Sequence, residues 1–94
     1  MTTSNIYWRT LATFGAVHNL DKTIEECAEL ISEVVREKHG RSDLDKLANE
    51  AADVWICLEI LRCHMGPEFD RALDAKLNRL AKRIAEKESA HAST

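Results

Sequence analysis

Apolar residues recur every three or four positions along most of this chain, which is the spacing of one face of an α-helix. The pattern predicts four helices, over about residues 4–17, 20–39, 43–64 and 67–87. Gly40 ends the second, because glycine is common just past a helix C-terminus, and Ser42 is a suitable N-cap for the third. Gly66 and Pro67 break the chain before the fourth, with Pro67 at a favoured first helical position. Short turns predict an all-α fold with antiparallel neighbours.

The fourth predicted helix has the clearest amphipathic pattern. The length of the chain indicates whether the chain alone can bury the apolar side of this helix. A chain of 94 residues allows one domain, over 1–94, with residues 88–94 as a frayed tail. A domain of this size buries only a modest core. We therefore expect a four-helix bundle completed by oligomerisation, as a homodimer or homotetramer. The apolar stripe of the fourth helix consists of Phe69, Leu73, Leu77, Leu80 and Ile84.

Composition narrows the classes of function. The net charge of −3 argues against a general nucleic-acid binder. Three cysteines without a CxxC pair suit reduced thiols in a cytoplasmic protein better than disulfides or a zinc site. No apolar run approaches the roughly 20 residues of a membrane-spanning helix, and no signal peptide is recognisable. We expect a cytoplasmic protein with no membrane or nucleic-acid partner.

Acidic residues follow one narrow stripe of the second predicted helix. Like charges spaced three and four residues apart repel one another. One interpretation is a solvated acidic face beside an apolar stripe that packs in the core. The acids are Glu26, Glu29, Glu33 and Glu37, and the apolar stripe is Ile24, Cys27, Ala28, Ile31 and Val35.

Two further acids, Glu50 and Asp53, fall within the apolar face of the third predicted helix. A carboxylate on a core-facing stripe is costly unless it is paired or bound to a metal. Salt bridges to a neighbouring helix are one explanation. The other is that these acids face Glu26 and Glu29 across a helical hairpin and form a four-carboxylate site. All-oxygen ligands favour Mg²⁺, with Mn²⁺ as a possible substitute.

The fourth predicted helix carries a basic stripe, formed by Lys76, Arg79 and Arg83 at three- and four-residue spacing. An ordinary solvated basic face explains this stripe equally well. Magnesium is usually held by few carboxylates together with substrate phosphates, and cations could meet those phosphates. Acids, metal and basic stripe together indicate a site for phosphoryl chemistry.

The motif Glu26-x-x-Glu29, followed after twenty residues by Glu50-x-x-Asp53, resembles the ExxE…ExxD signature of the all-α, MazG-like NTP pyrophosphohydrolases. This resemblance covers about residues 6–84, and the basic fourth helix resembles that of short phage- and mobile-element-type members. It implies Mg²⁺-dependent cleavage of a nucleoside triphosphate to a monophosphate and pyrophosphate.

The resemblance also implies roles for individual residues. It makes Glu26, Glu29, Glu50 and Asp53 metal ligands, with Glu26 as the catalytic base and Glu33 in reserve. Lys76 and Arg83 would contact phosphates, and Asn19 the sugar or base. Leu80 departs from the family, in which many members have Asn at that position.

Two other functions remain open on the sequence alone. One is a non-enzymatic helical dimer, such as a phage or plasmid regulator or an antitoxin, which would need no buried acids. The other is a phosphoribosyl-ATP pyrophosphohydrolase, which has a related fold and reaction. Thermal stabilisation by Mg²⁺ would favour an enzyme over the non-enzymatic dimer. An assay of phosphoribosyl-ATP beside the common NTPs would distinguish the two pyrophosphohydrolases.

Overall fold

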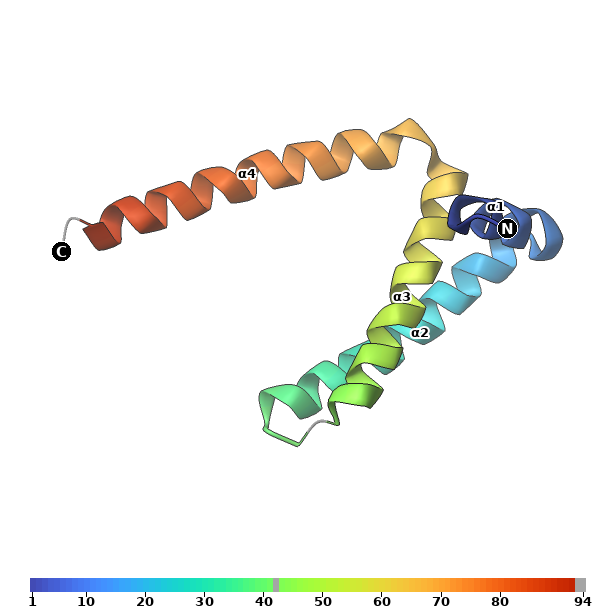
Figure 1. Ribbon diagram of the computed structural model, residues 1–94, viewed down its shortest axis with the longest axis horizontal. Coiled ribbons are helices and arrows are strands. Elements are labelled where there is room, and N and C mark those ends of the chain that lie inside the picture. The colour runs from blue at the N-terminus through green and yellow to red at the C-terminus, as the bar shows by residue number, and fades with distance from the viewer. Residues whose placement is uncertain (42, 93–94) are drawn as a thin grey trace. The chain divides into compact units, whose positions relative to one another are not determined.

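The computed structural model describes residues 1–41 and 43–92, and within these ranges the chain forms four α-helices and no strand (Figure 1). They are α1 (Thr3–Phe14), α2 (Ala16–Lys38), α3 (Leu44–Met65) and α4 (Pro67–Ala92). The predicted all-α class is confirmed. The chain divides into two units, Met1–His64 and Met65–Thr94, and each is described by itself.

The boundary between α1 and α2 lies at Gly15, earlier than the sequence predicts. Gly15 has φ +88° and ψ 163°, a backbone conformation that is essentially restricted to glycine. Its N–H still donates to the Leu11 carbonyl oxygen, so α1 ends there with a capped turn. Val17 therefore belongs to α2, and the expectation that the first helix continues to Val17 is wrong.

The turn between α2 and α3 has well-defined caps on both sides. Gly40 donates to Glu37 O at 3.0 Å and Arg41 donates to Arg36 O at 2.9 Å, which is the hydrogen-bond pattern of a Schellman motif. The predicted end of α2 at Gly40 is confirmed. On the other side, the Asp43 carboxylate accepts from Asp45 N at 2.9 Å and acts as the N-cap of α3. The cap predicted at Ser42 lies outside the described residues.

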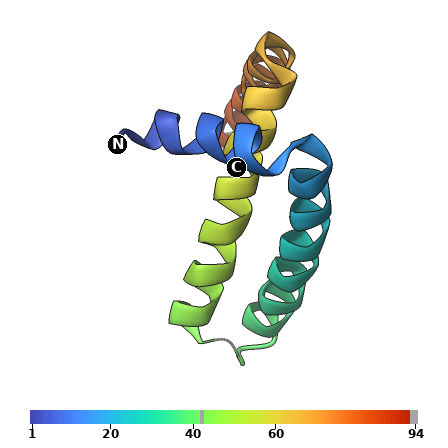
Figure 2. The ribbon, with the colours of Figure 1, turned by 90° about the vertical axis from the view of Figure 1, so that its right-hand side faces the viewer.

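Within the first unit, α2 and α3 form an antiparallel hairpin and α1 crosses its other end (Figure 2). Contacts between side chains fix the pairing of the two helices. Asn19, near the start of α2, meets Cys57 in the second half of α3, whereas Glu33 meets Lys46 near the start of α3. The predicted antiparallel arrangement of these two helices is confirmed.

The face that α2 turns inward carries polar residues at its most buried positions. Asn19 and Glu33 are buried, and Glu26 lies half-buried between them. By contrast, Ile24 is 71% exposed and Ile31 is 64% exposed. The interpretation of the acids as a solvated face is therefore wrong for Glu26 and Glu33, although Glu29 and Glu37 are exposed as it expects. Of the apolar stripe that it places in the core, Ile24, Ala28, Ile31 and Val35 are exposed in the single chain. The buried apolar residues, among those described, are Val54, Cys57 and Ile60 of α3.

The second unit contains α4, which begins at Pro67 as predicted and continues to Ala92. Residues 88–92 of the expected frayed tail are helical; they contain no glycine or proline and two alanines, the best helix former. Residues 93–94 of that tail lie outside the described residues. The apolar stripe of α4 is exposed from Leu73 to Ile84. In the described part of the chain, no helix is long and apolar enough to cross a membrane.

Candidate metal centre

Three carboxylates meet where α2 faces α3. Glu26 and Glu29 of α2 and Glu50 of α3 each place an oxygen within 4.8 Å of the others. This is the facing arrangement that the paired motifs predicted, and we call these three residues the carboxylate cluster. The Glu26 side chain is only 13% exposed, Glu50 is half-buried and Glu29 is exposed. The cluster thus opens to solvent on the Glu29 side.

Two oxygens of the cluster are buried and, in the described structure, have no hydrogen-bond partner: Glu26 Oε2 and Glu50 Oε2. Buried polar atoms in proteins are normally paired, because losing water without a new partner costs free energy. A bound cation would supply the missing partner for both oxygens. Carboxylate oxygens suit a hard divalent ion such as Mg²⁺ or Mn²⁺, so the residues present fit the metal that the sequence implies.

The surroundings of the cluster disfavour its charged form. Burial raises the pKa of Glu26 above its ordinary value of 4.5, and the negative charges of Glu29 and Asp53 raise that pKa further, while Lys22 lowers it. The pKa of Glu29 is raised first by a hydrogen bond with the Glu50 side chain and then by the charge of Glu50. Neighbouring carboxylates that cannot all ionise freely also bind cations favourably, because a cation removes their repulsion.

Asp53, the fourth predicted ligand, is exposed, so the expectation that it is buried is wrong. It lies one turn beyond Glu50 on α3 and lines the same hollow as Glu26. Its charge contributes to the raised pKa of Glu26. Asp53 therefore borders the carboxylate cluster without joining the group of three.

A first hollow of about 300 Å³ adjoins Glu26 and Asp53 between α1, α2 and α3. Its walls are largely apolar, with Phe14 from α1 and Ile56 and Ile60 from α3. The ring of Phe14 stacks on His18 with 5.0 Å between the ring centroids. An aromatic and apolar wall next to a metal-type cluster suits the uncharged part of a ligand.

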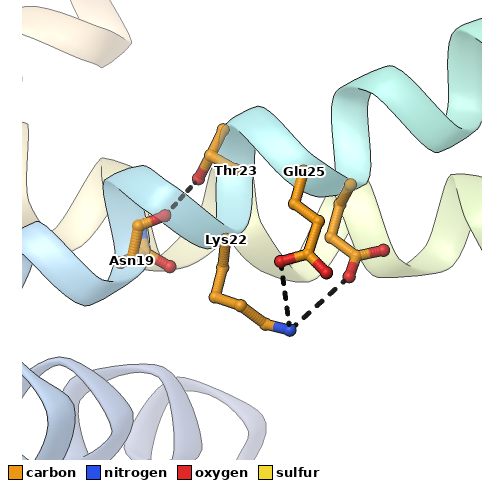
Figure 3. A network of polar contacts seen from close by, with 5 residues as sticks. Asn19, Lys22, Thr23 and Glu25 are labelled. Atoms are coloured by element: carbon orange, nitrogen blue, oxygen red, sulfur yellow. Dashed lines mark hydrogen bonds and ion pairs between the residues drawn. The ribbon is translucent and has the colours of Figure 1, made fainter.

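Asn19, predicted to contact sugar or base, lines this first hollow and is only 5% exposed. Its Nδ2 donates to the Cys57 carbonyl oxygen at 3.4 Å. Its backbone carbonyl oxygen accepts from the Thr23 hydroxyl at 2.7 Å, as drawn in Figure 3. Asn19 thus connects α2 to α3 beside Glu26. A contact with substrate stays a prediction.

Lys22 was not selected by the sequence analysis, yet it adjoins the cluster. Its Nζ lies 3.8 Å from Glu25 Oε2, as drawn in Figure 3, and 3.8 Å from Glu26 Oε1. The four-residue spacing from Lys22 to Glu26 was the available signal, because such residues are neighbours on a helix.

A second hollow of about 340 Å³ lies on the other side of the cluster. It is lined by Glu29, Ser32 and Glu33 of α2 and by Lys46 and Glu50 of α3. Glu33 is 4% exposed and its Oε1 lies 3.3 Å from Lys46 Nζ and 3.8 Å from Arg36 Nε. The reserve candidate for the base is therefore an ion-pair partner, and the sequence analysis did not single out Lys46.

The predicted phosphate-binding residues, Lys76 and Arg83, are exposed on α4 in the second unit. Their expected contact with phosphates stays a prediction. Among the described residues of the first unit, Lys22 lines the first hollow and Lys46 the second.

Comparison of the chain with models of protein families, with curated proteins and with solved structures finds no match in any of the three.

Proposed function

We propose that this chain is a Mg²⁺-dependent nucleoside-triphosphate pyrophosphohydrolase, which cleaves an NTP or dNTP to the monophosphate and pyrophosphate. The observation that carries the proposal is the pair of buried, unpartnered oxygens on Glu26 and Glu50, within a cluster of three carboxylates. The resemblance of the ExxE…ExxD motif to MazG-like enzymes supports the same reaction.

Glu26, Glu29 and Glu50 would hold the metal. Asp53, which the resemblance makes a fourth ligand, lines the adjoining first hollow. When bound, Mg²⁺ neutralises phosphate charge and orients the phosphate that is attacked. Magnesium normally keeps few protein ligands and completes its coordination with phosphates and water. The exposed side of the cluster, at Glu29, leaves room for those ligands.

Glu26 would act as the general base. Its side chain is only 13% exposed, and burial together with the charges of Glu29 and Asp53 raises its pKa, which makes it a stronger proton acceptor than an ordinary carboxylate. In this role it would accept a proton from the water that attacks the phosphate.

The remaining substrate contacts follow from the two ends of the nucleotide. The nucleoside part would lie in the first hollow beside Asn19 and Phe14. Lys76 and Arg83 would meet the phosphates from α4, as the resemblance implies. A homodimer or homotetramer would cover the exposed apolar residues of α2 and α4.

A screen of the common NTPs and dNTPs with Mg²⁺, with separate assays for pyrophosphate and orthophosphate, tests this proposal. We expect stoichiometric pyrophosphate and nucleoside monophosphate from at least one substrate, and no turnover in the presence of a chelator. Release of orthophosphate with a nucleoside diphosphate would falsify the assignment, because it places the cleaved bond elsewhere.

A helical dimer without enzymatic activity, such as a regulator or antitoxin, is the second candidate. The strong exposure of Ile24 and Ile31 favours it, because an apolar helix face of this kind suits association. Such a protein has no need for divalent metal. Self-association combined with no effect of Mg²⁺ on thermal stability would select this alternative.

A further inference from the structure

We infer that the second hollow binds the diphosphate portion of the substrate, which becomes pyrophosphate, and that Lys46 is the cation that recognises it. The inference rests on the proposed function and extends it. It gives the substrate a direction across the site, with the nucleoside in the first hollow and the terminal phosphates in the second.

The two hollows differ in the chemistry of their walls. The first is lined by Phe14, Ile56 and Ile60 among other residues, whereas the second is lined by Ser32, Lys46 and three glutamates. The carboxylate cluster borders both, because Glu26 lines the first and Glu29 and Glu50 line the second. A phosphate bound at the cluster would thus have an apolar space on one side and a polar space on the other.

Lys46 is held in position by a buried partner. Its Nζ lies 3.3 Å from Oε1 of Glu33, a residue that is 4% exposed, while 59% of the Lys46 side chain is exposed. An ammonium group has three N–H donors, and this ion pair needs only one of them. The ion pair therefore directs Lys46 into the second hollow and leaves it donors for the oxygens of an anion.

The glutamates make the second hollow selective for an anion that arrives with metal. Without a cation, Glu29 and Glu50 repel a diphosphate, and Lys46 already neutralises Glu33. Magnesium bound by the cluster would remove that repulsion. We therefore expect diphosphate binding to require Mg²⁺, and we expect Lys46 to add affinity on top of the metal.

Calorimetric titration with imidodiphosphate, a pyrophosphate analogue that resists hydrolysis, tests this inference in the presence of Mg²⁺. Lys46→Gln should weaken binding of imidodiphosphate by about ten- to a hundredfold, which is typical for loss of one hydrogen bond to a charged group. Lys46→Arg should restore most of the affinity because it keeps the cation. The affinity of Lys46→Gln for the best nucleoside monophosphate should stay within about twofold of wild type.

Lys22→Gln is the matched control. It removes one positive charge beside the same cluster, 3.8 Å from Glu26, but on the first hollow. Its affinity for imidodiphosphate should change much less than that of Lys46→Gln. An equal loss of affinity for imidodiphosphate in both variants would mean that any positive charge near the cluster has the same effect. That result would overturn the inference.

Two further outcomes separate this inference from the proposed function. If wild type binds neither Mg²⁺ nor imidodiphosphate, the proposed function fails. If wild type binds both and Lys46→Gln binds imidodiphosphate normally, the inference alone fails. Should loss of the Glu33 partner unfold the single variant, the double variant Glu33→Gln/Lys46→Gln removes both charges together and should show the same loss of affinity.

Discussion

Glu26 and Glu50 each carry a carboxylate oxygen that is shielded from water and lacks a hydrogen-bond donor. At the scale of single residues this is unfavourable for folding, because an unpaired buried polar atom costs free energy. Sites that bind metal commonly hold their ligands in such arrangements, with the ion as the missing partner. Stability and function can therefore be measured on the same side chains.

Without metal, the protein should become less stable as pH rises from the ordinary glutamate pKa of 4.5 through the higher pKa values of the folded state. Glu26 and Glu29 have pKa values in the folded state above the ordinary value of 4.5. Folding therefore favours the protonated form of both groups. The charged form reduces the free energy of unfolding, and this reduction is absent at pH values below the pKa of the unfolded state and complete at pH values above the pKa of the folded state. Urea unfolding in a chelator at about pH 4 and about pH 8 measures the difference in the free energy of unfolding. The double variant Glu26→Gln/Glu29→Gln should reduce this dependence of stability on pH. An unchanged pH dependence in that variant would show that these two glutamates do not cause it.

Mg²⁺ should stabilise the fold through the carboxylate cluster. At a hundredfold excess over its dissociation constant, a ligand that binds only the folded state adds about 2.7 kcal/mol to the free energy of unfolding. Glu50→Gln should lose that gain while the metal-free protein stays folded. Glu59→Gln, also on α3 but paired with Arg62, is the control and should keep it. Thermal unfolding with and without Mg²⁺ gives the measurement, and a full gain in Glu50→Gln would argue against the site.

Glu26→Gln should lower kcat by about 10²–10⁴-fold, the usual cost of removing a general base. Lys76→Ala should instead raise KM, if its phosphate contact is equally strong in the ground state and the transition state. Steady-state kinetics with the best substrate of the screen separates the two. Full activity in Glu26→Gln would leave the reaction in place and require another base.

At the scale of helices, periodicity and caps predicted four elements, the Gly40 cap and the Pro67 start. They did not predict the break at Gly15, because a single glycine near a helix end gives no sign of the backbone angle it adopts. They also did not decide which face of α2 is covered. The spacing and polarity of the residues distinguish two faces of the helix, but they do not show which face packs against α3. Lys46 was missed for a related reason: its contact with Glu33 depends on the pairing of two helices.

Gly15→Ala should destabilise the first unit through the backbone alone. Gly15 has φ +88° and ψ 163°, and no atom lies within 4 Å of an added Cβ, so crowding plays no part. A non-glycine residue in such a conformation costs roughly 1–3 kcal/mol. Gly40→Ala, at φ +69°, is the comparison and should cost about 1–2 kcal/mol. Denaturant midpoints measure both, and a neutral Gly15→Ala would show that the chain can turn there without glycine.

At the scale of the whole molecule, the chain should associate with itself. Few apolar residues are buried in the described part of the single chain, while apolar residues of α2 and α4 are exposed. Sedimentation at micromolar concentration should show a dimer or tetramer. Ile31→Glu should shift this distribution toward monomer, and Lys38→Glu, at the end of α2, should not. A stable wild-type monomer would contradict the prediction.

Because α2 carries the carboxylates on one face and an exposed apolar stripe on another, catalysis and assembly can be damaged separately. A chain with Glu26→Gln would keep the stripe of Ile24 and Ile31 and could still join wild-type chains. Expressed in excess, such a chain would act as a dominant inhibitor, if substrate contacts come from more than one subunit. A chain that also carried Ile31→Glu would lose this effect, so a genetic interference experiment in cells would report whether neighbouring subunits share one active site.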